Sequence, residues 1–134
     1  MPGILRLPAV WLSMQENSFI QLVPINFDDF HQISEYFFNY MKEIDEDYNL
    51  NKKNCDDFLQ AVFSSSKREL FWIFKNNNIC GFTFLTIEKN WPEMQSNKGR
   101  VSEFYVFPEL RRQNLGKQVF GEITRYFINK NCNK

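Results

Sequence analysis

Residues 101–117 restrict the fold of this chain more than any other part of the sequence. The run Val101–Phe107 is rich in aromatic and β-branched residues and predicts a strand that ends at Pro108. From Glu109 the apolar residues recur at helical spacing, as far as about Asn129. The inward positions of this predicted helix are Leu115, Val119, Phe120, Ile123 and Phe127. A strand that leads directly into a helix predicts a fold in which helices pack against a sheet.

The turn between this strand and this helix concentrates positive charge. Arg111, Arg112 and Lys117 lie around this turn, with the two arginines in the first turn of the predicted helix and Gly116 close behind them. A helix N-terminus presents unpaired backbone N–H groups and the positive end of the helix dipole, and a glycine lets a ligand approach the backbone closely. The pattern suits a pyrophosphate, although the spacing GxxxxGK[ST] of a P-loop is absent. The simpler interpretation is that the cations are solvated, but cations at this position oppose the dipole, which favours an anionic ligand.

Hydrophobic patterning upstream of residue 101 predicts the remaining elements. Strands are expected at Phe19–Ile25, Glu69–Phe74 and Ile79–Ile87, and helices from Asn26 to Ile44 and from Cys55 to Phe63. The three residues Asn76–Asn78 predict a turn between the second and third strands, because asparagine tolerates positive φ. The order is strand, helix, helix, strand, strand, strand, helix. This order is typical of an α/β chain with a mixed, mostly antiparallel sheet flanked by helices.

The segment around the turn resembles the coenzyme A-binding motif of GNAT-type N-acetyltransferases. That motif is a strand ending near Val-x-Pro, followed by [RQ]-x-x-G-x-[GA] at the start of a long helix. Here it reads Tyr105-Val106-Phe107-Pro108 and then Arg111-Arg112-Gln113-Asn114-Leu115-Gly116. The order of the preceding elements is also similar, so the resemblance covers about Phe19 to Asn129. It implies a GNAT-like α/β fold.

The resemblance implies a function and a set of cofactor-binding residues. The family transfers an acetyl group from acetyl-CoA, its co-substrate, directly to an amine of a small molecule or peptide. By resemblance, the backbone N–H groups of Gln113, Asn114, Leu115, Gly116 and Lys117 hold the pyrophosphate. Arg111, Arg112 and Lys117 add positive charge nearby. The strand edge at Phe104, Tyr105 and Val106 pairs with the pantetheine arm.

Glu103 is the candidate general base, because acidic side chains on this strand have that role in some relatives of the family. Strict alternation along the strand places Ser102 and Glu103 on opposite faces of the sheet. Relatives of the family more often direct the face of Ser102 to the site, so the resemblance implies that Glu103 faces the helix side. In that position Glu103 also has the simpler interpretation of a packing residue without a catalytic role.

Two departures from the family pattern carry expectations of their own. Asn114 stands where the family usually has its first glycine. The family also continues with another strand, a helix and further strands, and one of the later residues is a tyrosine that often serves as general acid. We therefore expect residues 18–134 to be a single GNAT-like domain without its C-terminal strands, and residues 1–17 to lie outside the fold. The Val101–Phe107 strand is then an edge strand, which favours a homodimer through its unpaired backbone groups.

Composition excludes several other classes of protein. The 134 residues predict one domain. The 16 basic and 16 acidic residues give a net charge of zero, so the positive surface that nucleic-acid binding requires is not expected. No apolar run approaches the roughly 20 residues of a membrane span. We therefore expect neither nucleic acid nor a membrane as a partner.

The cysteines predict a reduced, cytoplasmic protein without a metal site. Cys55, Cys80 and Cys132 are odd in number and form no CxxC pair, and His31 is the single histidine. A zinc site would therefore lack ligands, and free thiols in a reducing compartment are the simpler interpretation.

Two further classes of function remain open from the sequence. One is a non-catalytic remnant of the GNAT fold that binds coenzyme A as a binding module. The other is a small interaction domain that uses its exposed strand edge to pair with another chain. Binding of coenzyme A distinguishes the first of these from the second, and turnover with an amine distinguishes an acetyltransferase from both.

Overall fold

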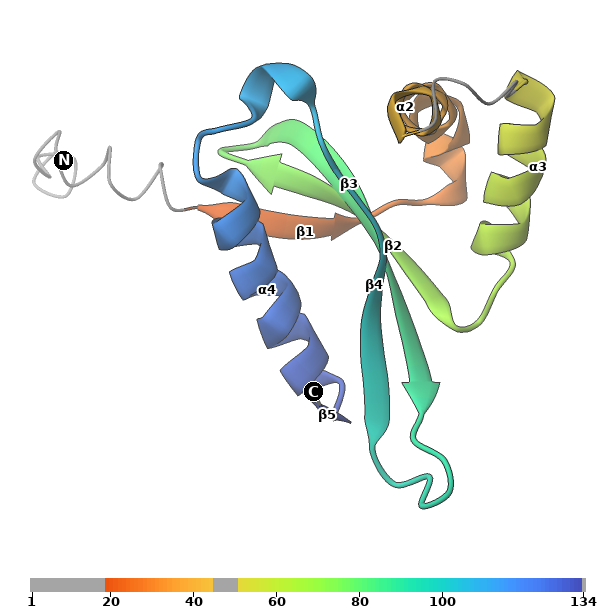
Figure 1. Cartoon of the computed structure of the whole chain (residues 1–134), viewed down its shortest axis with the longest axis vertical. Helices are drawn as coiled ribbons and strands as arrows, with labels where there is room; N and C mark the ends of the chain where they lie inside the picture. The colour runs from red at the N-terminus through yellow and green to blue at the C-terminus, as the bar shows by residue number, and fades with distance from the viewer. Residues whose placement is uncertain (1–18, 45–50, 134) are drawn as a thin grey trace, which may run out of the picture.

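A computed structural model describes residues 19–44 and 51–133, which form one sheet with helices on both of its faces (Figure 1). The strands are β1 (Ile20–Pro24), β2 (Arg68–Lys75), β3 (Asn78–Lys89), β4 (Asn97–Val106) and β5 (Cys132–Asn133). The α-helices are α2 (Phe30–Ile44), α3 (Lys52–Phe63) and α4 (Leu115–Asn129), with short 3₁₀ turns at Phe27–Asp29 and Pro108–Leu110. This arrangement confirms the predicted α/β class and order of elements. The expected extension at residues 1–17 lies outside the described residues.

The sheet has the strand order β1-β2-β3-β4-β5, and its first four strands are antiparallel. The turn between β2 and β3 lies where the asparagines predict it, with Asn76 at φ 53° and Asn77 at φ 71°. These positive values explain the asparagines, whose side chains can bond to the nearby backbone in this conformation.

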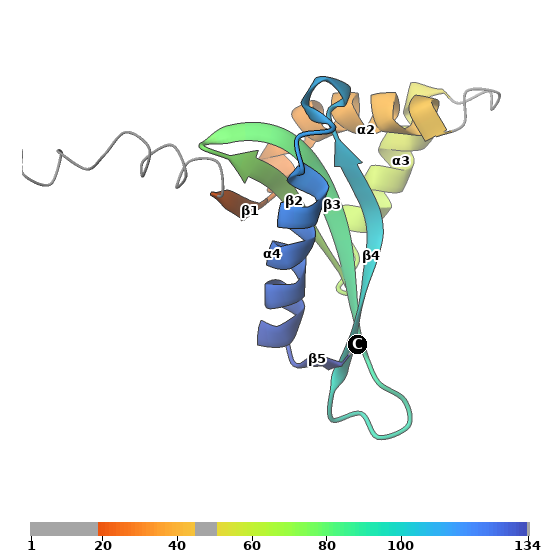
Figure 2. The same cartoon turned by 60° about the vertical axis from the view of Figure 1, so that its left-hand side comes forward.

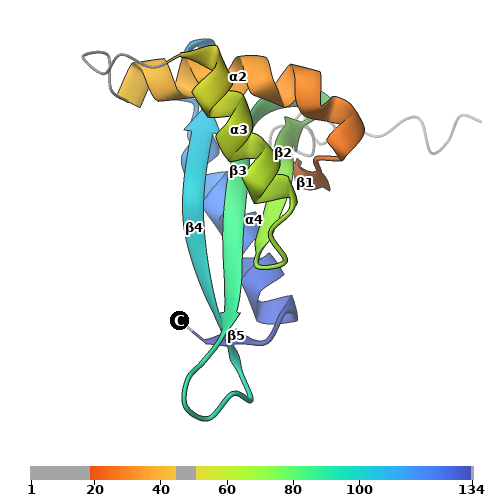
Figure 3. The same cartoon turned by 90° about the vertical axis from the view of Figure 1, so that its right-hand side faces the viewer.

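Helices cover both faces of the sheet, so the central strand β3 is buried on both sides. Helices α2 and α3 lie on one face and α4 lies on the other (Figure 3). Phe82 and Phe84 of β3 pack with Phe37 and Leu59 on the α2–α3 side, whereas Leu85 packs on the side of α4. Apolar residues on both sides of β3 therefore replace the alternation of a half-exposed strand.

Helix α4 begins later than the sequence predicts. Its first residue is Leu115 rather than Glu109, because Pro108–Leu110 forms a 3₁₀ turn and the next four residues are not helical. Arg112 at φ 65° and Asn114 at φ 62° are in the left-handed region, which an α-helix cannot include. The two arginines therefore lie in the turn before α4 and not in its first helical turn.

Other boundaries also differ from the prediction. Helix α3 begins at Lys52 rather than Cys55, because the side chain of Asn51 accepts a hydrogen bond from the Asn54 backbone N–H at 2.8 Å. Strand β4 begins at Asn97, four residues before the predicted Val101.

The sequence predicts no strand after α4, and this prediction is wrong for Cys132 and Asn133. These two residues form β5, which pairs in parallel with Asn97 and Lys98 at the start of β4 (Figure 2). The Asn97 N–H donates to the carbonyl of Asn131 at 2.8 Å and so fixes the end of α4 to the sheet. A strand of two residues has no periodicity that a sequence could reveal. Among the described residues, β4 from residue 99 to residue 106 has no neighbouring strand on this side, in agreement with the predicted edge.

Three further observations on the described residues concern membrane spans, the cysteines and metal sites. No helix among them is long and apolar enough to cross a membrane. The three cysteines are free thiols, with Cys55 and Cys80 buried. No group of three or more histidine, cysteine and acidic side chains within residues 19–44 and 51–133 is arranged to hold a metal ion.

Candidate functional site

A groove runs along the end of β4, past the turn that follows it, to the first residues of α4. Its volume is about 530 Å³, and the C-terminal end of α2 forms its other wall. We call it the β4–α4 groove. It is lined by Tyr40, Glu43, Ile44, Phe104, Tyr105, Val106, Arg111, Arg112, Asn114, Leu115 and Gly116.

The strand wall of the groove is held by side chains that point to opposite faces of the sheet. The ring of Phe104 stacks on Phe120 of α4, with 4.9 Å between centroids. The ring of Tyr105 packs against Tyr40 of α2 at 5.2 Å. Because the side chains are directed to the two faces, the backbone edge of β4 lies between them without a neighbouring strand in the described chain.

The helix wall combines free backbone donors with a glycine that the protein's own packing does not require. The first N–H groups of α4 have no partner within the helix. A Cβ added to Gly116 would meet no atom within 4 Å, whereas one added to Gly99 would come within 2.6 Å of the Phe127 ring. Gly121, farther along α4, also has open space around it, but it does not line the groove. Gly116 therefore leaves room for a ligand at the N-terminus of α4.

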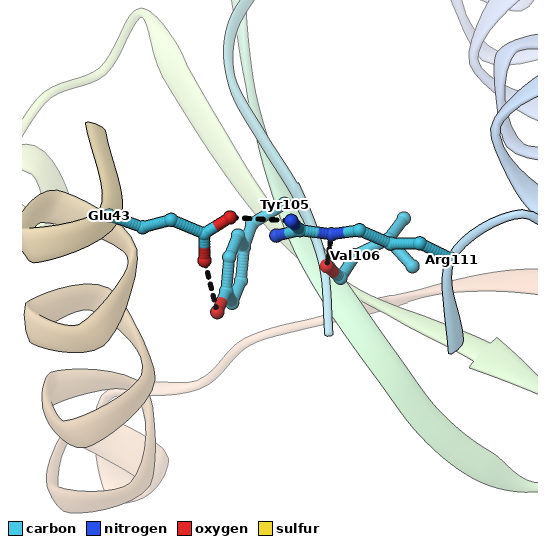
Figure 4. A network of polar contacts seen from close by, with 4 residues as sticks. All are labelled: Glu43, Tyr105, Val106 and Arg111. Carbon is cyan, nitrogen blue, oxygen red and sulfur yellow. Dashed lines mark hydrogen bonds and ion pairs between the residues drawn. The ribbon is translucent and has the colours of Figure 1, made fainter. Parts of the chain in front are cut away.

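Arg111 connects the end of β4 to α2 across the groove (Figure 4). Its Nε donates to the carbonyl oxygen of Val106 at 2.8 Å, and its guanidinium forms an ion pair with Glu43. The Tyr105 hydroxyl donates to the same carboxylate at 3.2 Å, and the Arg111 guanidinium lies 5.3 Å from the centre of the Tyr105 ring.

These contacts determine the protonation states of Glu43 and Tyr105. The hydrogen bond from Arg111 lowers the pKa of Glu43, so this carboxylate is anionic at neutral pH. Burial, reinforced by Glu43, raises the pKa of Tyr105, so its hydroxyl keeps its proton. Much of the positive charge of Arg111 is therefore balanced by Glu43 before any ligand binds.

The other predicted cations are placed differently. Arg112 lines the groove, and within the described part of the chain neither Arg112 nor Lys117 forms an ion pair. Lys117 and Gln113 are exposed near the start of α4 and do not line the groove. Arg112 is therefore the groove cation whose charge is available to an anion.

Glu103 does not line the groove, whereas its hydrogen-bond partner Tyr40 does. The Tyr40 hydroxyl donates to Glu103 Oε1 at 2.6 Å. Burial, followed by the contact with Glu103, raises the pKa of Tyr40, so the phenol is neutral at physiological pH.

A shift in strand register corrects the predicted orientation of Ser102. Phe84 of β3 is opposite Glu103 and Leu85 is opposite Val101, so Ser102 is an extra residue in β4. Its hydroxyl forms a hydrogen bond with Thr86, which is on the same face of β3 as Phe84. Strict alternation therefore fails at this bulge, and Ser102 and Glu103 both face the α2–α3 side.

Sequence reasoning missed the groove residues of α2. These residues are Tyr40, Glu43 and Ile44. Tyr40 bonds to Glu103, 63 positions away, and Glu43 bonds to Arg111, 68 positions away. One signal could have indicated Tyr40. It continues the steps of three and four that begin at Ile33 and Phe37, and all three side chains are buried.

Comparison with known proteins relates this arrangement to one family. Residues 28–134 match the family model described as the acetyltransferase (GNAT) family. No curated protein sequence matches the chain.

Several solved structures share the fold at low sequence identity. A GNAT family acetyltransferase from Staphylococcus aureus has a TM-score of 0.66 at 18% identity, over 85% of this chain and 82% of that one. A ribosomal-protein-alanine N-acetyltransferase from Brucella melitensis has a TM-score of 0.67 at 15% identity, over 87% and 76%. A "predicted acetyltransferase with acetyl-CoA" from Clostridium acetobutylicum has a TM-score of 0.65 at 11% identity, over 87% and 78%.

Proposed function

Because the chain belongs to the GNAT acetyltransferase family, we propose that it transfers an acetyl group from acetyl-CoA to a primary amine. The observation that carries this proposal is the β4–α4 groove, where the open N-terminus of α4 meets an unpaired strand edge. A helix N-terminus suits a phosphate, and a strand edge suits a chain with amide groups. Coenzyme A contains both within one molecule.

The residues present fit this cofactor. The open space at Gly116 leaves the first N–H groups of α4 accessible, and a side chain at that position would fill it. In the proposed complex the backbone from Gln113 to Lys117 holds the pyrophosphate, and Arg112 adds positive charge. The backbone of Phe104, Tyr105 and Val106 pairs with the pantetheine arm.

Acetyl-CoA supplies an acetyl group as a thioester that an amine can attack directly. The protein's contribution is to place the thioester beside the amine and to accept the proton that the amine loses. The acceptor is a primary amine of a small molecule or of a peptide. The Brucella structure of similar fold is named for a protein acceptor.

The proposal is tested by binding and by turnover. Acetyl-CoA is expected to raise the melting temperature of the chain, because a ligand that binds only the folded state stabilises it by RT ln(1 + [L]/Kd). Gly116→Val should abolish this shift. Gly121→Val is the matched control, because it places the same side chain into equally open space on α4, outside the groove.

The outcomes separate the candidate functions. Binding together with release of the coenzyme A thiol in the presence of a primary amine supports an acetyltransferase. Binding without turnover across a panel of polyamines, aminoglycosides and peptide N-termini supports the non-catalytic coenzyme A-binding module. If a folded chain shows no shift at millimolar acetyl-CoA, or if both glycine variants behave alike, the groove is not the cofactor site.

A further inference from the structure

Tyr40 is the link between the β4–α4 groove and the carboxylate of Glu103. The Tyr40 side chain lines the groove, and its residue is 9% exposed. Its hydroxyl donates to Glu103 Oε1 at 2.6 Å, and Glu103 itself does not line the groove. Tyr40 therefore joins the lining of the groove to a carboxylate that does not line it.

Packing on both partners fixes this geometry. The Tyr40 ring contacts Phe37 at 5.8 Å, Phe82 at 5.4 Å and Tyr105 at 5.2 Å between centroids. The backbone carbonyl of Glu103 accepts a hydrogen bond from the Thr83 hydroxyl at 2.7 Å, which anchors β4 beside its bulge. The hydroxyl and the carboxylate are thus held in place by the core and not by a flexible loop.

The other carboxylate near the groove is less suited to accept a proton. Glu43 forms an ion pair with Arg111, which lowers its pKa, and it also accepts from the Tyr105 hydroxyl. Among the described residues Glu103 has no cationic partner, and its one side-chain contact is the neutral Tyr40 hydroxyl. The Glu103 carboxylate is therefore joined to the groove through Tyr40 alone, whereas Glu43 is already held by a cation.

On the basis of the proposed acetyl transfer, we propose that Tyr40 is the catalytic residue that takes the proton of the attacking amine while it passes its own hydroxyl proton to Glu103. The amine enters neutral, and its lone pair forms the new C–N bond as its proton moves to Tyr40. The C–S bond breaks, and its electron pair leaves on sulfur. The proton on Glu103 then returns through Tyr40 to the thiolate, which gives the amide and the free thiol of coenzyme A.

The test compares Tyr40→Phe with Tyr36→Phe. Tyr36 lies one turn earlier on α2, where its ring packs on Trp72 and Phe107 and its hydroxyl has no hydrogen-bond partner among the described residues. General acid–base catalysis contributes about 10²–10⁴-fold, so Tyr40→Phe should lower kcat by about that factor. Acetyl-CoA binding should be unchanged in both variants, and Tyr36→Phe should keep the wild-type kcat.

Glu103→Gln tests the second step without removing the hydrogen bond, because the amide oxygen still accepts from Tyr40. It should lower kcat, because an amide cannot take up the proton that Tyr40 passes on. The other titratable groups that line the groove with Tyr40, namely Tyr105, Glu43, Arg111 and Arg112, are unchanged in this variant. A second readout does not depend on activity, namely the titration of the tyrosines by ultraviolet difference spectroscopy. The midpoint for tyrosinate formation should be lower in Glu103→Gln than in the wild type.

Failure of this inference is distinguishable from failure of the proposed function. If the wild type binds and turns over acetyl-CoA, and if folded Tyr40→Phe or folded Glu103→Gln keeps the wild-type kcat, the relay is overturned and the acetyltransferase stands. If the wild type does not bind acetyl-CoA, both are overturned. Should Tyr40→Phe fail to fold, the kinetics and tyrosinate titration of Glu103→Gln decide the question.

Discussion

Asn114 occupies a backbone conformation that few residues adopt without cost. Its φ of 62° and ψ of 21° are left-handed, and it directly precedes the first residue of α4. Asparagine tolerates this region better than alanine because its side chain can bond to nearby backbone groups. The conformation therefore explains why an asparagine can stand where the GNAT motif usually has a glycine.

The first prediction concerns substitutions at this residue. Asn114→Ala should lower the free energy of unfolding by about 1 kcal/mol, whereas Asn114→Gly should not lower it, since glycine has no Cβ to strain. Asn114→Gly should also bind acetyl-CoA more tightly, because it removes a side chain from the groove wall. Urea denaturation and titration calorimetry measure the two effects.

Asn77→Gly is the control for both measurements. Asn77 has a similar φ of 71°, but it lies in the turn between β2 and β3, away from the groove. Like Asn114→Gly, the Asn77→Gly variant should not lower the free energy of unfolding. Unlike Asn114→Gly, it should not raise the affinity for acetyl-CoA. A gain in affinity for Asn77→Gly as well, or a loss for Asn114→Gly, would contradict the assignment of Asn114 to the cofactor wall.

Between elements, one partly buried hydrogen bond between side chains joins α2 to α3. The hydroxyl of Ser34, which is 2% exposed, donates to Asp56 Oδ1 at 2.6 Å. The two partners differ in their access to water, because Asp56 is only partly buried. Loss of one partner therefore has a different effect from loss of the other.

The second prediction follows from that asymmetry. Asp56→Ala leaves a buried hydroxyl without a partner and should lower the free energy of unfolding by about 1–3 kcal/mol. Ser34→Ala should cost less, because the Asp56 carboxylate can turn to water. Asp57→Ala, on the same helix, removes only an exposed i,i+4 ion pair with Lys53 and should change stability by less than about 0.5 kcal/mol. Equal losses for Ser34→Ala and Asp56→Ala in chemical denaturation would refute the argument.

The elements also show which parts of the fold a sequence can reveal. Helices and strands with a sustained apolar period, such as α2 and β3, are predicted because the core requires that period. The start of α4 and the bulge at Ser102 are not, because each depends on the backbone conformation of single residues. The strand–turn–helix part of the groove is predicted because its residues are contiguous. The wall from α2 is not, since it depends on how separate elements pack in three dimensions.

At the scale of the whole molecule, the unpaired edge of β4 is the feature with the widest consequence. From residue 99 to residue 106 this edge has no neighbouring strand within the described chain, and its end lines the groove. Two kinds of chain with amide groups can pair with such an edge, namely the pantetheine arm and a strand from a second copy of the protein. Both would use the same backbone groups.

The third prediction is that these two partners exclude one another. Sedimentation velocity at increasing protein concentration should show dimers in the absence of ligand, and saturating acetyl-CoA should return the chain to monomers. Gly116→Val, which loses the cofactor but leaves the strand edge intact, should stay dimeric under both conditions. If the dimer fraction does not respond to acetyl-CoA in the wild type, any dimer forms through another surface, and a monomer under all conditions would refute the predicted association.

If the two partners compete for this edge as predicted, the fraction of dimer would depend on the concentration of acetyl-CoA. By mass action, scarce acetyl-CoA would then favour paired copies with a blocked edge, and abundant acetyl-CoA would favour single copies. The chain would then hold a reserve of enzyme whose size follows the concentration of its own co-substrate, with no separate regulatory site.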